Sequence, residues 1–179
     1  MARVMPLALV LCVIASAEAG AGEATSSAAR HAATPMRAGA GARAFTPDGM
    51  KWVDAPSLLP PGIRMFVMEG DPARPGPYTL RLWLPANCRI GPYWRFNPER
   101  LTVMLGVVIL GMGDVYTERE GIAVHAGSFA VVPERTHHFV WTRDVAVVQL
   151  HGNGPWDIMY VRAGDDPRQA TRPGHTRRR

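Results

Sequence analysis

The sequence of 179 residues has room for one ordinary domain, and 47% hydrophobic against 20% charged residues is typical of a packed core rather than a disordered chain. The net charge of +5 comes from the ends: residues 1–44 hold four basic and two acidic side chains, residues 162–179 hold six and two, and residues 45–161 hold ten and eleven. A nearly neutral central region does not indicate a basic face, so we expect no nucleic-acid partner.

The N-terminal part of the chain precedes the expected domain. Residues 1–19 combine a basic start, an apolar run and small residues, which is typical of a secretory signal peptide that is too short to span a membrane. Residues 20–44 are rich in Ala, Gly, Ser and Thr and predict a flexible linker. We therefore expect an exported protein, periplasmic or secreted, without a membrane span.

The two cysteines predict no disulfide within the exported chain. Cys12 lies inside the apolar run and would be removed with the signal peptide, which leaves Cys88 alone. We expect Cys88 to be a buried small hydrophobic residue.

Residues 45–161 contain apolar segments separated by turn residues. The clearest is residues 78–84, in which Tyr78, Leu80, Leu82 and Leu84 alternate with more polar side chains, as in a half-buried antiparallel strand. Residues 85–98 contain three prolines and predict an irregular excursion at the sheet edge. Strands are expected at residues 63–69, 78–84, 100–110 with a bend at 106, 115–117, 122–124, 127–132, 137–142, 145–151 and 157–161.

No segment keeps a helical period, so the fold class is all-β. Short strands at close spacing predict a single β-sandwich or barrel of the jelly-roll kind over residues 45–161. Residues 162–179 are expected to form a basic disordered tail.

Residues 127–141 stand out because they place two adjacent histidines at the start of a strand. His137 and His138 must lie on opposite faces of that strand, so one of them faces inward. An inward imidazole is a candidate metal ligand or acid/base. The alternative is a core histidine that merely satisfies its hydrogen bonds, and the sequence leaves both open.

Two stretches resemble the paired motifs of the cupin superfamily, a double-stranded β-helix barrel. In that family the first motif is Gly, five residues, His-x-His, three or four residues, Glu, six residues, Gly. The second is Gly, five residues, Pro-x-Gly, two residues, His. Here Glu99 and Gly106 match the first motif, and Gly127, Pro133 and His138 match the second. The resemblance implies that Glu99 and His138 are the metal ligands.

The chain departs from the first motif where the family has its other two ligands. The His-x-His positions hold Tyr93 and Arg95, the opening glycine is Asn87, and the second glycine of the second motif is Arg135. Glu99 and His138 alone are too few for a catalytic zinc or iron, which takes three protein ligands. Arg95 cannot coordinate a metal, because a guanidinium has no free lone pair. We expect no cofactor, or a weakly bound divalent transition metal.

Arg95 itself has two expected positions. It either points inward and pairs with Glu99, so that a fixed cation replaces the metal, or it extends to solvent while apolar groups fill the pocket. Tyr93, Arg95, His137 and His151 are the residues that we expect around the pocket, with His151 at its rim.

The sequence leaves two functions open. One is a binding or non-catalytic module, whose cavity takes a small organic ligand. The other is a metal-dependent cupin enzyme, of dioxygenase or isomerase type, that uses Glu99 and His138 with recruited ligands. A third class, which the sequence does not rank, is a sensor or partner-binding protein whose barrel faces mediate a homodimer, as cupin-like folds often do.

Overall fold

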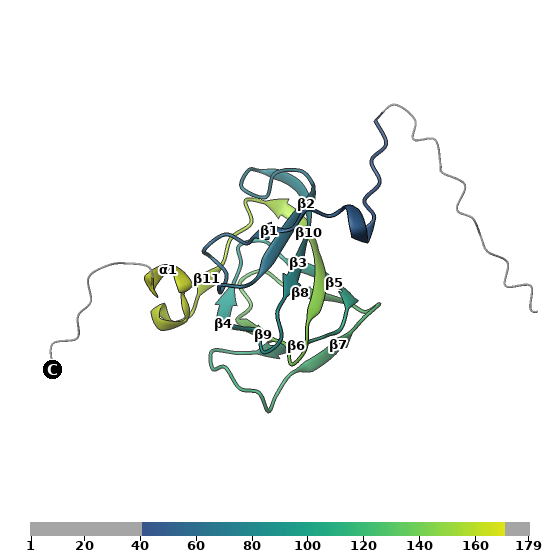
Figure 1. Cartoon of the computed structure of the whole chain (residues 1–179). Coiled ribbons are helices and arrows are strands. Elements are labelled where there is room, and N and C mark those ends of the chain that lie inside the picture. The colour runs from purple at the N-terminus through teal and green to yellow at the C-terminus, as the bar shows by residue number, and fades with distance from the viewer. Residues whose placement is uncertain (1–40, 171–179) are drawn as a thin grey trace, which may run out of the picture. The chain divides into compact units, whose positions relative to one another are not determined.

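The computed structural model describes residues 41–170 (Figure 1). The predicted signal peptide at 1–19 and all of the predicted linker except residues 41–44 lie outside this range. The elements are η1 (Pro47–Gly49), β1 (Val53–Asp54), β2 (Arg64–Glu69), β3 (Gly76–Leu84), β4 (Arg89–Trp94), β5 (Glu99–Leu105), β6 (Val107–Met112), β7 (Ile122–His125), β8 (Phe129–Val132), β9 (His138–Trp141), β10 (Ala146–Gly154), β11 (Met159–Tyr160), η2 (Ala163–Asp165) and α1 (Pro167–Ala170).

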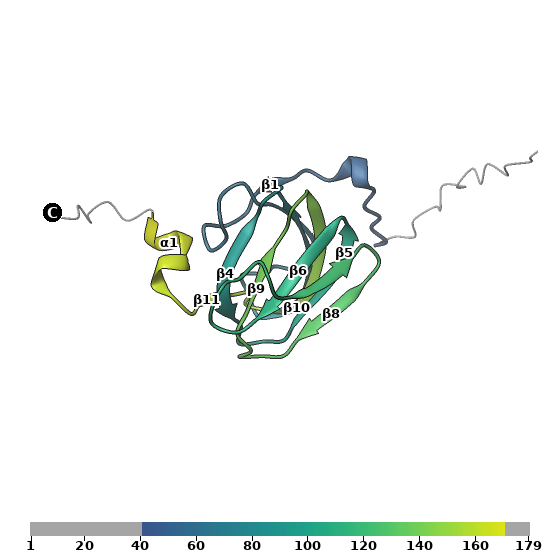
Figure 2. The same cartoon turned by 90° about the horizontal axis from the view of Figure 1, so that it is seen from below.

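The strands form two sheets in which every pairing is antiparallel. The first sheet has the order β1-β2-β3-β10-β5-β8 and the second has the order β11-β4-β9-β6-β7. Figure 2 shows β4, β9 and β6 of the second sheet side by side. This arrangement confirms the predicted all-β jelly-roll barrel.

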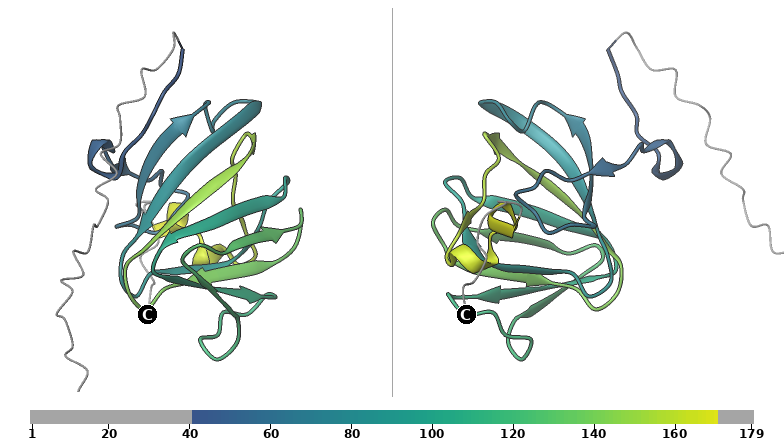
Figure 3. Two further views of the ribbon diagram at one scale, coloured as in Figure 1. Left: turned by 90° about the vertical axis from the view of Figure 1, so that its right-hand side faces the viewer. Right: turned by 60° about the vertical axis from the view of Figure 1, so that its left-hand side comes forward.

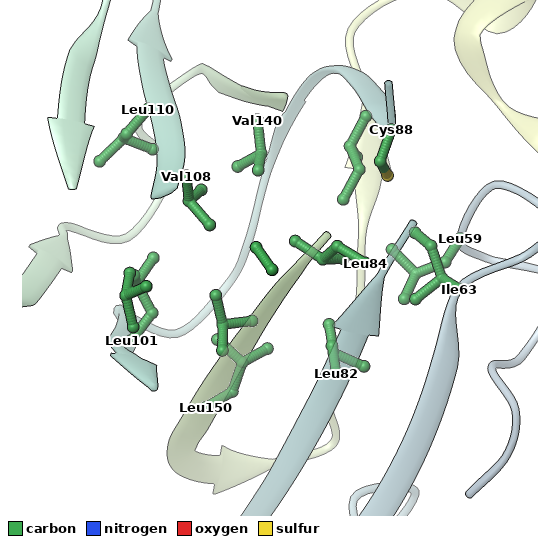
Figure 4. Packing of buried hydrophobic residues seen from close by; sticks show 14 of the residues in the cluster. Leu59, Ile63, Leu82, Leu84, Cys88, Leu101, Val108, Leu110, Val140 and Leu150 are labelled. Atoms are coloured by element: carbon green, nitrogen blue, oxygen red, sulfur yellow. The ribbon is translucent and has the colours of Figure 1, made fainter. Parts of the chain in front are cut away.

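The core lies between the two sheets, because each sheet turns alternate apolar side chains inward. Along β3, Tyr78, Leu80, Leu82 and Leu84 are all buried, as their alternation predicts. Figure 4 shows leucine and valine side chains from both sheets meeting in this core. Burying one such side chain contributes about 1.5–3 kcal/mol relative to leaving it in water.

The prediction for residues 85–98 was wrong. Residues Arg89–Trp94 form β4, which pairs with both β9 and β11 and is therefore an inner strand of its sheet. The ladder between β4 and β9 is irregular between Ile90 and Tyr93, which allows Pro92, without an N–H, to sit inside a strand. The carbonyl of Pro92 still accepts a hydrogen bond from the Val161 N–H at 2.9 Å.

Two shorter segments also differ from the prediction. Residues 115–117 form no strand, and Tyr116 instead packs its ring 5.3 Å from that of Phe139. The predicted disordered tail begins at residue 162, whereas the chain forms η2 and α1 there (Figure 3). The rest of that tail, residues 171–179, lies outside the described range. Among residues 41–170, no helix has the length and apolar character of a membrane span.

Candidate functional site

The interior of the barrel holds Tyr93 and His138, which are paired across β4 and β9. Each has a relative exposure of 1%, and their ring centroids lie 4.1 Å apart. The inward-facing histidine of the adjacent pair is thus His138. Its strand begins at this residue, so the imidazole enters the barrel at one end of the sheet.

Two buried charges lie next to these rings. Arg95 directly follows β4, and Glu99 opens β5; both are more than nine-tenths buried. The Nε of Arg95 forms an ion pair with Oε2 of Glu99. Of the two positions expected for Arg95, the structure has the inward one.

Glu99 has further polar contacts with side chains of the same cluster. The Tyr93 hydroxyl donates to its two oxygens, at 3.1 Å and 3.3 Å. His138 Nδ1 lies 2.9 Å from the Thr136 carbonyl and, since a carbonyl only accepts, carries a proton there. His138 Nε2 lies 3.3 Å from Glu99 Oε2, a hydrogen bond only when Nε2 also carries a proton.

The protonation states of Glu99, Arg95 and Tyr93 are set by burial and by their mutual contacts. Burial raises the pKa of the Glu99 carboxyl, but the Arg95 guanidinium and His138 outweigh burial, so the pKa lies well below its ordinary value. Burial lowers the pKa of Arg95, and Glu99 more than reverses that effect. Burial and then the Glu99 charge raise the pKa of Tyr93 well above its ordinary value. At neutral pH the site therefore contains a carboxylate, a guanidinium and a neutral phenol.

Arg95 also contacts residues that the motif spacing did not predict as its neighbours. Its Nη1 donates to the carbonyl of Asp157, and its Cζ lies 5.2 Å from the Trp156 ring centroid and 5.1 Å from that of Tyr93. Asp157 is 62 residues away from Arg95, and no motif spacing links the two. Two aromatic faces and two acceptors leave the guanidinium little freedom to move.

Little space remains beside this cluster. The cavity that touches Tyr93, Arg95 and Glu99 has a volume of about 20 Å³ and is otherwise lined by apolar core side chains. That is room for about one water molecule, whereas pockets for organic ligands usually measure about 300–1,000 Å³. The barrel interior as it stands is a packed core.

The residues do not fit a catalytic divalent metal. No group of three or more His, Cys, Asp or Glu side chains within residues 41–170 is placed to hold one. Glu99 and His138 supply two donors, and the Glu99 oxygen nearest to His138 is already paired with Arg95. A dication beside the Arg95 guanidinium would also be repelled, because both groups are positively charged.

The other two residues expected at the pocket lie elsewhere. His137 points outward and its Nδ1 lies 2.5 Å from Asp114 Oδ1. His151 sits in β10 and stacks on Phe129, with ring centroids 5.9 Å apart. Phe129 is exposed, so His151 faces the outside of the barrel rather than its rim.

Comparisons with solved structures place this architecture among known folds. The polyketide cyclase RemF from Streptomyces resistomycificus aligns with a TM-score of 0.56 at 14% identity, over 70% of this chain and 89% of that chain. A putative acetylacetone dioxygenase from Methylibium petroleiphilum PM1 aligns with a TM-score of 0.53 at 15% identity, over 70% and 85%. An RmlC-like cupin from Shewanella frigidimarina NCIMB 400 aligns with a TM-score of 0.47 at 10% identity, over 61% and 87%.

These similarities concern the fold and not the activity. No protein-family model matches the sequence, and the search of curated proteins gives no match either.

Proposed function

We propose that this chain, which has the fold of the cupin superfamily, is a non-catalytic binding or structural module whose internal cation is Arg95. The observation that carries the proposal is the buried ion pair between Arg95 and Glu99. It stands at two positions where the motif resemblance expects metal ligands.

Three features of the site support this function over that of a metal-dependent enzyme. The donor set has two members where catalytic metal sites use three. The Glu99 carboxylate is neutralised by a group that cannot dissociate or coordinate. The neighbouring cavity of about 20 Å³ has no room for an organic substrate. Any ligand is then bound on the outside of the barrel.

Metal content tests this proposal. The protein is purified in the presence of manganese, iron, nickel and zinc, and bound metal is measured by mass spectrometry. We expect far less than one metal per chain, because Arg95 occupies the carboxylate. The double variant Tyr93→His with Arg95→His restores two imidazoles beside Glu99 and His138, and we expect it to gain metal.

The control for the double variant is Trp94→His with Phe96→His, which adds two imidazoles to the same segment at positions outside the barrel cluster. We expect this control to bind no more metal than the native chain. Near-stoichiometric metal in the native protein would contradict the proposal. So would a folded Tyr93→His, Arg95→His variant that stays free of metal.

A further inference from the structure

A second candidate site lies at the other end of the β4–β9 pair. Arg89 opens β4 and is paired with Trp141 at the end of β9, whereas Tyr93 and His138 mark the opposite end. A cavity of about 280 Å³ opens there, lined by Asn87, Arg89, Glu118, Trp141, Thr142 and Arg143. It is more than ten times larger than the space beside Arg95, and most of its lining side chains are polar.

The wall of this cavity is tied together by hydrogen bonds. The Asn87 N–H donates to the Arg143 carbonyl at 3.2 Å, and the Thr142 N–H donates to the Cys88 carbonyl at 3.0 Å. The hydroxyl of Thr142, which is 2% exposed, donates to the Pro85 carbonyl at 2.8 Å and accepts from the Cys88 N–H at 3.3 Å. These bonds hold the segment before β4 against the segment after β9, so the cavity is part of the folded framework.

Two guanidinium groups are held in this wall by aromatic rings. The Cζ of Arg89 lies 5.6 Å from the Tyr116 ring centroid, and that of Arg143 lies 5.5 Å from the Trp141 ring centroid. An arginine resting on an aromatic face loses little further freedom when it binds an anion. Both guanidinium groups are thus held in place in the wall of the cavity.

The two cations differ in what they already bind. Arg89 forms an ion pair with the Glu118 carboxylate, whereas none of the ion pairs within residues 41–170 includes Arg143. The indole N–H of Trp141 is buried and has no hydrogen-bond partner in the same part of the chain. A buried donor without a partner costs about 1–3 kcal/mol.

We propose that this cavity binds a small oxyanion, a carboxylate or a phosphate, with Arg143 as its principal contact. A planar guanidinium offers parallel N–H donors to two oxygens of either group. Glu118 occupies Arg89 as an internal carboxylate, so it competes with the ligand for the second cation. A volume of about 280 Å³ corresponds to about nine water molecules, which fits a small anion and its first waters.

Calorimetric titration of the full-length protein with sodium acetate and with sodium phosphate tests this site, with sodium chloride at matched ionic strength as the reference. We expect saturable binding of at least one of the two probes. Replacing Arg143 by Gln should raise the Kd by about tenfold or more, because it removes the charge-assisted bonds. Glu118→Gln should lower the Kd several-fold, because it frees Arg89.

The matched control is Arg100→Gln, which removes an exposed cation on β5, away from this cavity, and should leave the Kd unchanged. Circular dichroism shows that each variant is folded. Binding of acetate alone identifies a carboxylate site, binding of phosphate alone identifies a phosphate site, and both outcomes support the proposal. Saturable binding of neither probe, or an unchanged Kd in folded Arg143→Gln, overturns it.

Discussion

At the residue scale, the molecule depends on a pair of charges that are both removed from water. Desolvating a guanidinium and a carboxylate costs several kcal/mol each, and their attraction with added hydrogen bonds must offset that cost. Arg95 and Glu99 meet the condition, since Tyr93 and the Asp157 carbonyl supply further bonds. If one partner is removed, no water is available to solvate the charge that remains.

Removing one partner of this buried pair should cost more stability than removing both. Arg95→Met should destabilise the fold by about 3–5 kcal/mol, because it leaves the Glu99 carboxylate buried without a cation. The double variant Arg95→Met with Glu99→Leu should be less destabilised than Arg95→Met alone. Urea denaturation of the two single variants, the double variant and the native chain measures this coupling. Additive effects of the two substitutions would show that the pair is not energetically linked.

The same pair gives a dependence of stability on pH. The pKa of Glu99 is lower in the folded chain than its unfolded value of about 4.3, so its contribution is present above that pH. The contribution is lost as the pH falls below about 4.3 toward the folded pKa. We expect the free energy of unfolding to fall more steeply between pH 5 and pH 2 in the native chain than in the Arg95→Met, Glu99→Leu variant. Equal slopes in urea titrations at several pH values would contradict this assignment.

Motif spacing predicted that Tyr93, Glu99 and His138 meet inside the barrel, but it did not predict everything that holds them. His137 and His151, which were also expected at the pocket, lie elsewhere. Glu99 and His138 came together because turns and strands of fixed length carry them to the same end of two facing sheets. Whether Arg95 would turn inward could not be decided from spacing. Its inward position depends on Trp156 and on the Asp157 carbonyl, which are distant in sequence.

Among the connecting elements, two turns keep a backbone with positive φ although other residues replace the glycines of the motifs. Asn87 and Arg135 stand at two glycine positions of the motifs, and both have positive φ, at 57° and 55°. Asn adopts this region readily, whereas Arg does so at a cost. The Arg135 N–H donates to the Arg95 carbonyl at 2.8 Å, so this turn between β8 and β9 also positions the residue that replaces the metal ligand.

Substitutions at Arg135 should reveal that cost. Arg135→Gly relieves the backbone but adds freedom to the unfolded chain, so it should leave stability unchanged or raise it by up to about 1 kcal/mol. Arg135→Val places a β-branched side chain at positive φ and should destabilise the fold by about 1–2 kcal/mol. Thermal and urea unfolding compare the two. An Arg135→Val variant as stable as Arg135→Gly would show that the backbone at this turn adapts freely.

Sequence patterns predicted most strands and failed where a strand breaks the usual pattern. Alternation over residues 78–84 gave β3 and its buried face. The segment with three prolines was predicted to be irregular, yet it contains β4, because Pro92 falls where the ladder with β9 is interrupted. Local propensity carries no information about such an interruption, since it is set by the strands on both sides.

At the scale of the whole molecule, the described elements of residues 43–170 form one compact unit with its own core. All elements from η1 to α1 belong to this unit. The buried side chains of the core come from residues 50–158, so the apolar burial that stabilises the fold lies inside this unit.

A chain of residues 43–179 should therefore have the same urea midpoint as the full-length chain. The free energies of unfolding of the two chains should agree within about 0.5 kcal/mol. Circular dichroism and tryptophan fluorescence measure the two transitions side by side. A clear loss of stability in the shorter chain would mean that residues 1–42 contribute to the fold.

Cys88 gives this shorter chain a further property. It is the only cysteine left after residue 42, it is 6% exposed, and burial raises the pKa of its thiol to about 11. A thiol that is both shielded and protonated does not react with alkylating reagents in the folded state. The alkylation rate at neutral pH therefore reports how often the start of β4 becomes accessible, without any engineered label.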